Sequence, residues 1–256
     1  MSILEDILKN KKEEVEKRKR EVPVSSLQIQ SRSRKNCFKE ALLKKGLSII
    51  AEMKKKSPSA GIFKGSFNPQ SRARLYQTNG ARAISILTDK KFFGGTNDHL
   101  KEVRRCVNLP LLRKDFIIDE YQIHETAAIG ANAILLIVRI LEKSHLKELM
   151  RMAKSHNLDC LVEVHSAFEM ETALKVGADI IGINNRNLDT LEIDLNTSLT
   201  LRPLIPHNCL AISESGIRNV DHVKCMVNVG FDAILVGEAL MKSNDSGVTL
   251  EQLLSR

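Results

Sequence analysis

The feature of this sequence that most restricts its fold is a pattern that occurs four times, at intervals of about 50 residues. Each copy has a glycine, a short linker, and a run rich in isoleucine, leucine and valine. The copies are GARAISILT from Gly80, GANAILLIV from Gly130, GADIIGINN from Gly177 and GFDAILVGE from Gly230. An amphipathic helical stretch precedes each one. A glycine that ends a helix before a turn into a buried strand is typical of a helix-to-strand junction.

Four further apolar runs alternate with these copies: LSIIAEM before the first copy, and LPLLRKD, LDCLVEV and CLAISES between successive copies. Together they predict eight strands that begin near residues 47, 82, 109, 132, 158, 178, 209 and 233. The runs are continuously apolar, which indicates strands covered on both faces, as in a parallel sheet. Helical patterns between them predict an α/β fold, and eight units favour a (β/α)8 TIM barrel over an open sheet. No G-x-G-x-x-G follows the first run, which counts against a dinucleotide fold.

We therefore expect residues 47–256 to form one (β/α)8 catalytic domain. Residues 1–46 remain as an N-terminal helical extension, with REVPVSSLQIQSRSRK (residues 20–35) as its linker. No run approaches the roughly 20 apolar residues that span a bilayer, and the charged N-terminus is not a secretory signal. Five scattered cysteines without a C-x-x-C pair argue against a disulfide framework or a zinc site. The expected location is the cytoplasm.

The formal charge of +8 raises the question of nucleic acid. Part of the excess lies in KNKKEEVEKRKR (residues 9–20), where glutamates alternate with lysines at helical spacing. This run is typical of a solvated helix face with i,i+4 pairs. The chain has two tyrosines and no tryptophan to stack on bases. A basic surface also attracts anionic substrates. The prediction is a small phosphorylated substrate, with no nucleic acid and no membrane as partner.

In a barrel of this kind the reactive groups lie where strands end and loops begin. Polar residues at those positions are Glu52, Lys54, Thr88, Asp89, Lys114, Asp115, Glu163, His165, Asn184, Asn185, Arg186, Glu214, Ser215 and Glu238, and Leu136 and Val138 stand at the corresponding positions of the fourth strand. Arg113 and Lys54 are expected to lower the pKa of Lys114, and apolar neighbours to raise that of Glu163, as acid–base catalysis requires. The alternative for each residue is a structural ion pair at the barrel rim. No ligand-spaced partner of His165 supports a metal.

Two glycines follow the last two predicted strands, Gly216 in SESGI and Gly237 in LVGEAL. Their backbone N–H groups can approach an anion, and the short helix predicted after Gly237 would direct its positive end toward it. KKKSPSAG (residues 54–61) adds cations and hydroxyls, although alone it is typical of a solvated loop. Phe93 and Phe116 follow the second and third strands and would flank a ring-bearing substrate; for Phe116, covering the barrel core is an equal alternative.

The sequence resembles indole-3-glycerol phosphate synthase over essentially the whole chain. The resemblance rests on IIAEMKKKSPSAG, ISILTDKKFFGG, LPLLRKDFIID, GANAILLIV, LVEVH, IGINNRNL and ISESGI, in that order. It implies ring closure, decarboxylation and dehydration of 1-(2-carboxyphenylamino)-1-deoxyribulose 5-phosphate in tryptophan biosynthesis, by a carboxy-lyase with no cofactor and no metal. A monomer is favoured over an oligomer.

Roles follow from the resemblance, position by position. It implies that Lys114 is the general acid for ring closure and that Glu163 serves the later dehydration, with Glu52 and Asn184 assisting. Lys54 would hold the substrate carboxylate or phosphate, with its share of acid catalysis left open. Ser57, Arg186, Glu214 and Ser215 would line the substrate site. Gly216, Gly237 and Glu238 would bind phosphate, Glu238 through its backbone N–H. Phe93, Phe116 and Leu135 would form the apolar slot for the anthranilate ring.

Two alternatives stay open at this point. Phosphoribosylanthranilate isomerase would share the barrel and the phosphate face, but it works with a Cys/Asp pair, and the first predicted strand has no cysteine. A basic nucleic-acid-binding barrel would rest on charge alone. Lys114 and Glu163 must face each other across one cavity if the synthase interpretation is to hold.

Overall fold

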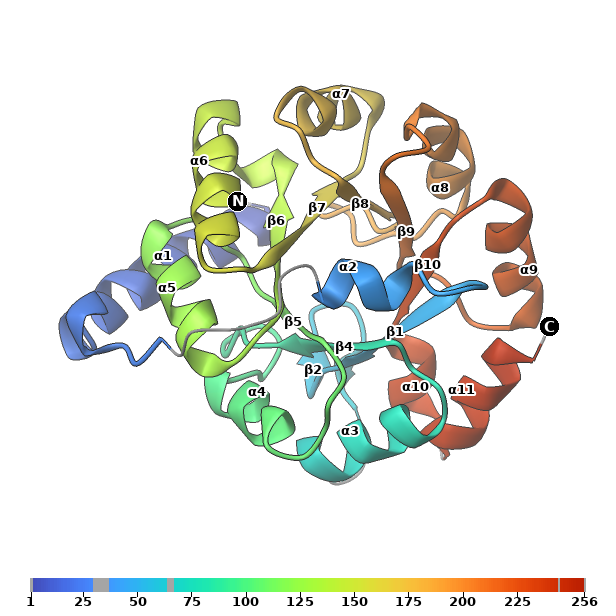
Figure 1. Cartoon of the computed structure of the whole chain (residues 1–256), viewed down its shortest axis with the longest axis horizontal. Helices are drawn as coiled ribbons and strands as arrows, with labels where there is room; N and C mark the ends of the chain where they lie inside the picture. Colours follow the sequence, from blue (N-terminus) through green and yellow to red (C-terminus); the bar gives the residue numbers. More distant parts are fainter. Residues whose placement is uncertain (1, 30–36, 64–66, 244, 256) are drawn as a thin grey trace.

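A computed structural model describes residues 2–29, 37–63, 67–243 and 245–255. Eight parallel strands close into a barrel in the order β1-β10-β9-β8-β7-β6-β5-β4 (Figure 1). The barrel strands are β1 (Ser48–Met53), β4 (Ala83–Leu87), β5 (Leu111–Lys114), β6 (Ala133–Ile137), β7 (Asp159–Val164), β8 (Ile180–Asn184), β9 (Leu210–Glu214) and β10 (Ala233–Val236). Each begins within two residues of its predicted start, so the prediction of a (β/α)8 barrel is confirmed.

Helices surround the barrel and alternate with its strands (Figure 1). They are α3 (Pro69–Thr78), α4 (Asn97–Arg104), α5 (Glu120–Ile129), α6 (Lys143–Ser155), α7 (Ala167–Lys175), α8 (Asn196–Leu201), α9 (Val220–Val229), α10 (Glu238–Lys242) and α11 (Ser246–Leu254), with 3-10 turns η2 (Val138–Ile140) and η3 (Arg202–Leu204). The glycine of the repeat ends a helix, as predicted. Gly130 follows α5 with a φ of 96°, a left-handed conformation in which a residue with a side chain is strained. No described helix has the length and apolar character needed to cross a membrane.

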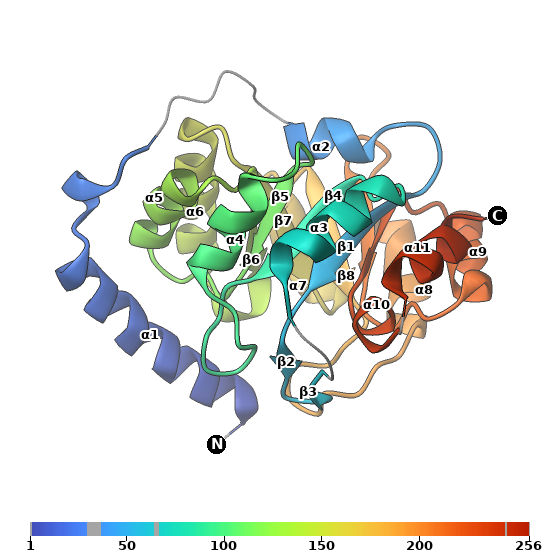
Figure 2. The same cartoon turned by 90° about the horizontal axis from the view of Figure 1, so that it is seen from below.

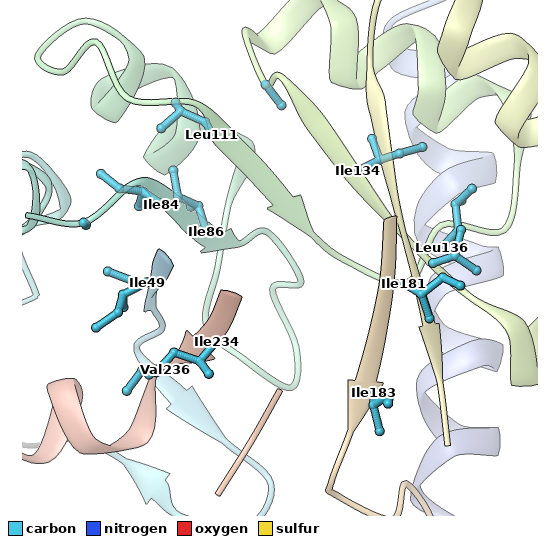
Figure 3. Close-up of a cluster of buried hydrophobic side chains, with 14 of the residues drawn as sticks. Ile49, Ile84, Ile86, Leu111, Ile134, Leu136, Ile181, Ile183, Ile234 and Val236 are labelled. Atoms are coloured by element: carbon cyan, nitrogen blue, oxygen red, sulfur yellow. The ribbon is translucent and has the colours of Figure 1, made fainter. Parts of the chain in front are cut away.

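Two apolar layers hold the barrel together. Side chains on the outer face of the strands, such as Ile49, Ile134 and Ile181, pack beneath the helices (Figure 3). Alternate residues of the same strands, such as Ile50, Leu135 and Ile212, form a separate cluster inside the barrel. Burial on both faces explains why the strands read as continuous apolar runs.

The two ends of the barrel are covered differently. Helix α2 (Cys37–Leu42) lies across one end, and its Phe38 and Leu42 join the interior cluster (Figure 2). Helix α1 (Ile3–Glu21) and the small β2–β3 ribbon (Lys56–Ser57 and Gly61–Ile62) lie toward the opposite end (Figure 2). The turn η1 (Val24–Ser26) follows α1, and residues 30–36, which include most of the remaining predicted linker, lie outside the described residues.

Helix α1 begins with a capping box made by Ser2 and Glu5. The predicted solvated face is present where Lys17 pairs with Glu21, both more than half exposed. The prediction is wrong for Lys11, whose side chain is only 1% exposed and forms ion pairs with Asp89 and Asp115. Arg18 also turns inward, to Glu125 of α5. The alternating charges of this run therefore include cations that attach α1 to the barrel.

Candidate active site

A cavity lies at the carboxyl ends of the barrel strands, where the sequence placed the reactive groups. Of the predicted site residues, all except Ser57 line it: Glu52, Lys54, Phe93, Lys114, Phe116, Leu135, Glu163, Asn184, Arg186, Glu214, Ser215, Gly216, Gly237 and Glu238. Ser57 lines an adjoining hollow that it shares with Lys54, Phe93, Phe116 and Arg186. The predicted residues thus converge on one region of the molecule.

Lys114, the last residue of β5, is the cation at the centre of this cavity. Its Nζ lies 2.7 Å from Glu163 Oε2, at the end of β7, and 3.1 Å from Glu214 Oε2, at the end of β9. Both carboxylates are almost fully buried. Neither Glu214 oxygen has an aligned hydrogen-bond donor within the part of the chain that the structure describes. The site therefore holds more carboxylate than its own donors satisfy.

The expected pKa directions for Lys114 and Glu163 are wrong. Burial lowers the pKa of Lys114, but the negative charges of Glu163, Glu214 and Glu52 outweigh burial and raise it above its usual value. Burial raises the pKa of Glu163, but Lys114, His165 and a hydrogen bond from Asn184 bring it below its usual value. Arg113 does not act on Lys114 as expected, because its guanidinium points out of the cavity toward α5.

The carboxyl group that titrates near neutrality is Glu214. Burial and the nearby charge of Glu163 raise the pKa of Glu214 to about 7, although Lys114 opposes the shift. Gly182 of β8 makes room for this carboxyl group, since a Cβ there would lie 2.1 Å from Glu214 Oε1. Lys114 is thus held as an ammonium and Glu163 as a carboxylate, the forms that can donate and accept a proton.

Glu52 and Lys54, at the end of β1, form a second ion pair in the cavity, with 2.6 Å between Oε1 and Nζ. Asn184, at the end of β8, accepts a hydrogen bond from the backbone N–H of Arg186 at 3.0 Å. These contacts fix the carboxylate of Glu52 and the amide of Asn184 in the cavity that Lys114 also lines. Both residues are more than nine-tenths buried.

The part of the cavity formed after β8, β9 and β10 carries the predicted anion-binding groups. Gly237 precedes α10, whose first residue is Glu238. The guanidinium of Arg186 lies 3.3 Å from the Glu238 carboxylate, which also pairs with Lys242 at 2.6 Å. Both Arg186 and Glu238 are partly exposed, so the pair can reorganise around an incoming anion.

Apolar side chains line the part of the cavity formed by β4, β5 and β6, opposite the predicted anion-binding groups. The rings of Phe93 and Phe116 are 6.2 Å apart and inclined at 37°, and Leu135 lines the same cavity. Phe116 also belongs to the interior apolar cluster, together with Leu4 and Ile7 of α1. The two interpretations of Phe116 are therefore compatible: it covers the barrel core and faces the cavity.

Some residues at strand ends do not serve the cavity as the sequence suggested. Thr88, Asp89 and the carboxylate of Asp115 join Lys11 and Arg113 in a buried network on the outer side of β5. Leu136 and Val138 belong to the layer beneath the helices. The Asn185 amide donates to Ser213 Oγ and to the backbone carbonyls of Glu214 and Ser215, and so it stabilises the start of the loop after β9.

The sequence reading missed two features of the site. Lys11 lay in a run that looked solvated; the available signal was its helical spacing, four residues from Ile7 and four from Val15, which are buried on the same face of α1. His165 was considered only as a metal ligand, yet it is buried beside Glu163. Its position two residues after Glu163 in LVEVH was the available signal, because residues i and i+2 of a strand share a face.

The comparisons with known proteins agree with this geometry. The family model described as indole-3-glycerol phosphate synthase matches residues 4–253. The chain belongs to the indole-3-glycerol phosphate synthase family. It is 45% identical over 245 residues to the indole-3-glycerol phosphate synthase of Thermoanaerobacter pseudethanolicus, covering 95% of this chain and 94% of that protein. It is 43% identical over 251 residues to the indole-3-glycerol phosphate synthase of Chlorobium chlorochromatii, covering 96% of this chain and 97% of that protein.

Solved structures of other enzymes share the fold of this family member at low sequence identity. A 3-hexulose-6-phosphate synthase superposes with a TM-score of 0.65 at 14% identity, over 81% of this chain and 98% of that chain. Thiamine phosphate pyrophosphorylase from Pyrococcus furiosus superposes with a TM-score of 0.61 at 18% sequence identity, over 81% of this chain and 94% of that chain. These likenesses show the barrel alone. Family membership decides between the two enzyme alternatives in favour of the synthase.

Proposed function

We propose that this indole-3-glycerol phosphate synthase family member closes the indole ring with Lys114 as general acid and Glu163 as its partner base. The observation that carries the proposal is the 2.7 Å contact between Lys114 Nζ and Glu163 Oε2 in a cavity at the carboxyl ends of the strands. The substrate is 1-(2-carboxyphenylamino)-1-deoxyribulose 5-phosphate. The products are indole-3-glycerol phosphate, CO2 and water.

In the first step a ring carbon of the aminobenzoate attacks the ketone carbon of the sugar chain, and Lys114 donates a proton to the ketone oxygen. The raised pKa of Lys114 supports this role, because the group enters the reaction protonated. Phe93, Phe116 and Leu135 hold the aromatic ring, so that the two carbons meet in a near-attack pose. Glu52 and Asn184 position the groups around the forming bond.

The carboxylate then leaves as CO2, and the electron pair of the broken bond restores the aromatic ring. The new hydroxyl takes a proton from a lysine of the site, Lys114 or Lys54, and leaves as water. Glu163 takes the N–H proton in this last step, which its lowered pKa supports because the group enters as a carboxylate. Lys54 pairs with the substrate carboxylate or phosphate and shares in acid catalysis. Ser57, Arg186, Glu214 and Ser215 contact the substrate, and the backbone N–H groups of Gly216, Gly237 and Glu238 bind its phosphate.

The proposal extends to the arrangement of the chain. Residues 1–46 act as an extension whose α1 covers the mouth as a lid, and residues 47–256 as the catalytic barrel. All the proposed site residues come from one chain, which supports a monomer as the working form. Cys106, Cys160, Cys209 and Cys225 are free thiols, which supports a reducing compartment, the cytoplasm. We also propose that the basic charge attracts the anionic substrate rather than nucleic acid or membranes.

The test is to add 1-(2-carboxyphenylamino)-1-deoxyribulose 5-phosphate to the purified protein and to follow the fluorescence of the indole product. We expect turnover without added metal or cofactor. Absence of indole formation by the folded protein would overturn the proposal. A retention assay on DNA and RNA across salt concentrations tests the binding alternative, which predicts salt-dependent retention and no ring closure.

A further inference from the structure

His165 lies immediately after β7 and presents both ring nitrogens to carboxylates. Nε2 lies 3.4 Å from Glu163 Oε1, and Nδ1 lies 3.1 Å from Oε2 of Glu169 in α7. The backbone N–H of His165 donates to the same Glu169 oxygen at 2.7 Å. The imidazole side chain is 8% exposed. It therefore sits in a nearly closed space between the candidate base and a second carboxylate.

The number of protons on the ring decides how well this arrangement is satisfied. A neutral imidazole carries one N–H and would direct a lone pair at one of the two carboxylates, whereas an imidazolium offers a proton to each. Nε2 has no hydrogen-bond partner among the described residues, and the atom it faces is Glu163 Oε1 at 3.4 Å. The second oxygen of Glu163 already accepts from Lys114. Glu163 thus has a cationic partner for each oxygen only when His165 is protonated.

The charges around His165 favour the protonated ring. They come from Glu163 on its own strand, Glu169 on α7 and Glu214 on β9, with Lys114 beyond Glu163. The turn η2 also packs against β7 and α7, and its Arg139 is paired with Asp189. Burial lowers the pKa of His165, but the hydrogen bond to Glu169 and the nearby carboxylates outweigh burial and raise it above its usual value.

We propose that His165, held as an imidazolium by Glu169, is a positioning residue that keeps Glu163 ionised and aims its carboxylate at Lys114. The inference rests on the proposed role of Glu163 as a base. It adds a second layer behind the base: a histidine that supplies positive charge, and a glutamate that orients the ring and stabilises its proton. Glu163 then remains a proton acceptor although it lies next to Glu214 in a buried site.

The test is the pH dependence of kcat for His165→Asn and Glu169→Gln. Removing the imidazolium takes away a cation next to Glu163, so the pKa of Glu163 rises and the acid limb of kcat moves to higher pH by about one unit. Glu169→Gln keeps an acceptor oxygen for the backbone N–H of His165 and loses only the negative charge. The acid limb of its kcat profile should also move to higher pH, but by less than in His165→Asn. Glu171→Gln is the matched control, because Glu171 lies on the same helix and pairs with Lys175 in solvent. Its profile should coincide with that of the wild type.

A lower kcat at every pH with an unmoved acid limb would show a merely structural role and overturn the proposal. A second measurement, carbon-13 NMR titration of the Glu163 carboxyl group, is expected to give a higher pKa in both variants than in the wild type. An unchanged value in Glu169→Gln, which needs no repacking, would also overturn it. Wild-type turnover in Glu163→Gln would instead remove the proposed base, so the two failures are distinguishable.

Discussion

Strand β5 carries two adjacent cations that end in different clusters of buried charge. Lys114 joins Glu163 and Glu214 in what we call the mouth cluster, which borders the cavity. Arg113 points to the other side and joins the outer cluster, composed of Lys11, Arg18, Asp89, Arg113, Asp115 and Glu125. The alternation of side chains along a strand separates the two by one residue.

The two clusters differ in how completely their charges are satisfied. The outer cluster has three cations for three carboxylates, and each has an ion-pair partner within 3.2 Å. Arg113 also donates to Thr88 and Thr126, although Asp89 Oδ2 lacks an aligned hydrogen-bond donor among the described residues. In the mouth cluster a single cation, Lys114, serves two carboxylates, and neither Glu214 oxygen has an aligned donor among the described residues. An open cavity also adjoins Lys114. A buried network with balanced charges holds elements in place, whereas one with excess carboxylate beside a cavity can exchange its internal contacts for contacts with a substrate.

The largest expected effect is on stability, from Lys11→Met in the outer cluster. The substitution leaves Asp89 and Asp115 buried without the ammonium now 3.0 and 2.8 Å away, and breaking a buried pair in this way costs about 3 kcal/mol or more. We expect thermal denaturation to show a Tm lower by roughly 6 to 12 °C.

Lys17→Met on the same helix is the control for Lys11→Met. The Lys17 side chain is 69% exposed and lies 3.6 Å from Glu21, so its loss should cost within about 0.5 kcal/mol. Equal effects of the two substitutions would remove the distinction between the buried cations and the solvated face of α1.

Glu163→Gln in the mouth cluster should change rate rather than binding. Loss of the proton acceptor should lower kcat by about 10²-fold or more, equivalent to roughly 2.7 kcal/mol in the barrier, while KM stays within a few-fold. Glu125→Gln in the outer cluster is the matched substitution and should lower the Tm. Its kcat should change little when the assay is run at a temperature where this variant is folded. Steady-state kinetics and melting curves of both variants test the comparison, which fails if Glu163→Gln turns over like the wild type.

A smaller effect, of opposite sign in the two clusters, concerns pH. The pKa of Glu214 is raised to about 7 in the folded protein, so the native state takes up a proton that the unfolded chain does not, and stability rises as pH falls from about 8 toward 5. The pKa of Asp115 lies well below its usual value because Lys11 and Arg113 outweigh its burial. The contribution of Asp115 to the stability of the folded state is therefore complete above about pH 5. It is lost as the pH falls below the pKa of an aspartate in the unfolded chain, near 3.9.

The measurement for this pH effect is the Tm of wild type and Glu214→Gln between pH 8 and pH 5. The wild type should gain on the order of 1 kcal/mol relative to the variant, or roughly 2 to 4 °C. Parallel curves for the two proteins would show that Glu214 does not titrate in this range.

The sequence predicted the barrel well because its determinants are local. Glycine-linked junctions and doubly buried strands are visible as a repeat, and the carboxyl end of each strand follows from the fold. That Lys114 and Glu163 converge was predictable for the same reason. The surroundings of each charge were not: Arg113, next in sequence to Lys114, lies on the other face of β5, while Glu214, 100 residues away, is in contact with it. The pKa directions were wrong for that reason.

Lys11 shows a second limit of the sequence. Lys11 is one of several lysines in a charged run, and its side chain is buried by the docking of α1 against the segments that follow β4 and β5. His165 shows a third, because its position beside Glu163 was visible but its partner Glu169 is one helical turn away in α7. Tertiary packing, which a single sequence does not encode locally, decides which member of a charged run becomes structural or functional.

The most direct test of the account is the kcat of Lys114→Ala for indole formation from 1-(2-carboxyphenylamino)-1-deoxyribulose 5-phosphate. Lys39→Ala serves as its control, since Lys39 pairs with Asp179 at the opposite end of the barrel. The account predicts a fall of at least about 10²-fold in a folded Lys114→Ala protein, and wild-type turnover in the control. Near wild-type turnover in Lys114→Ala would contradict it.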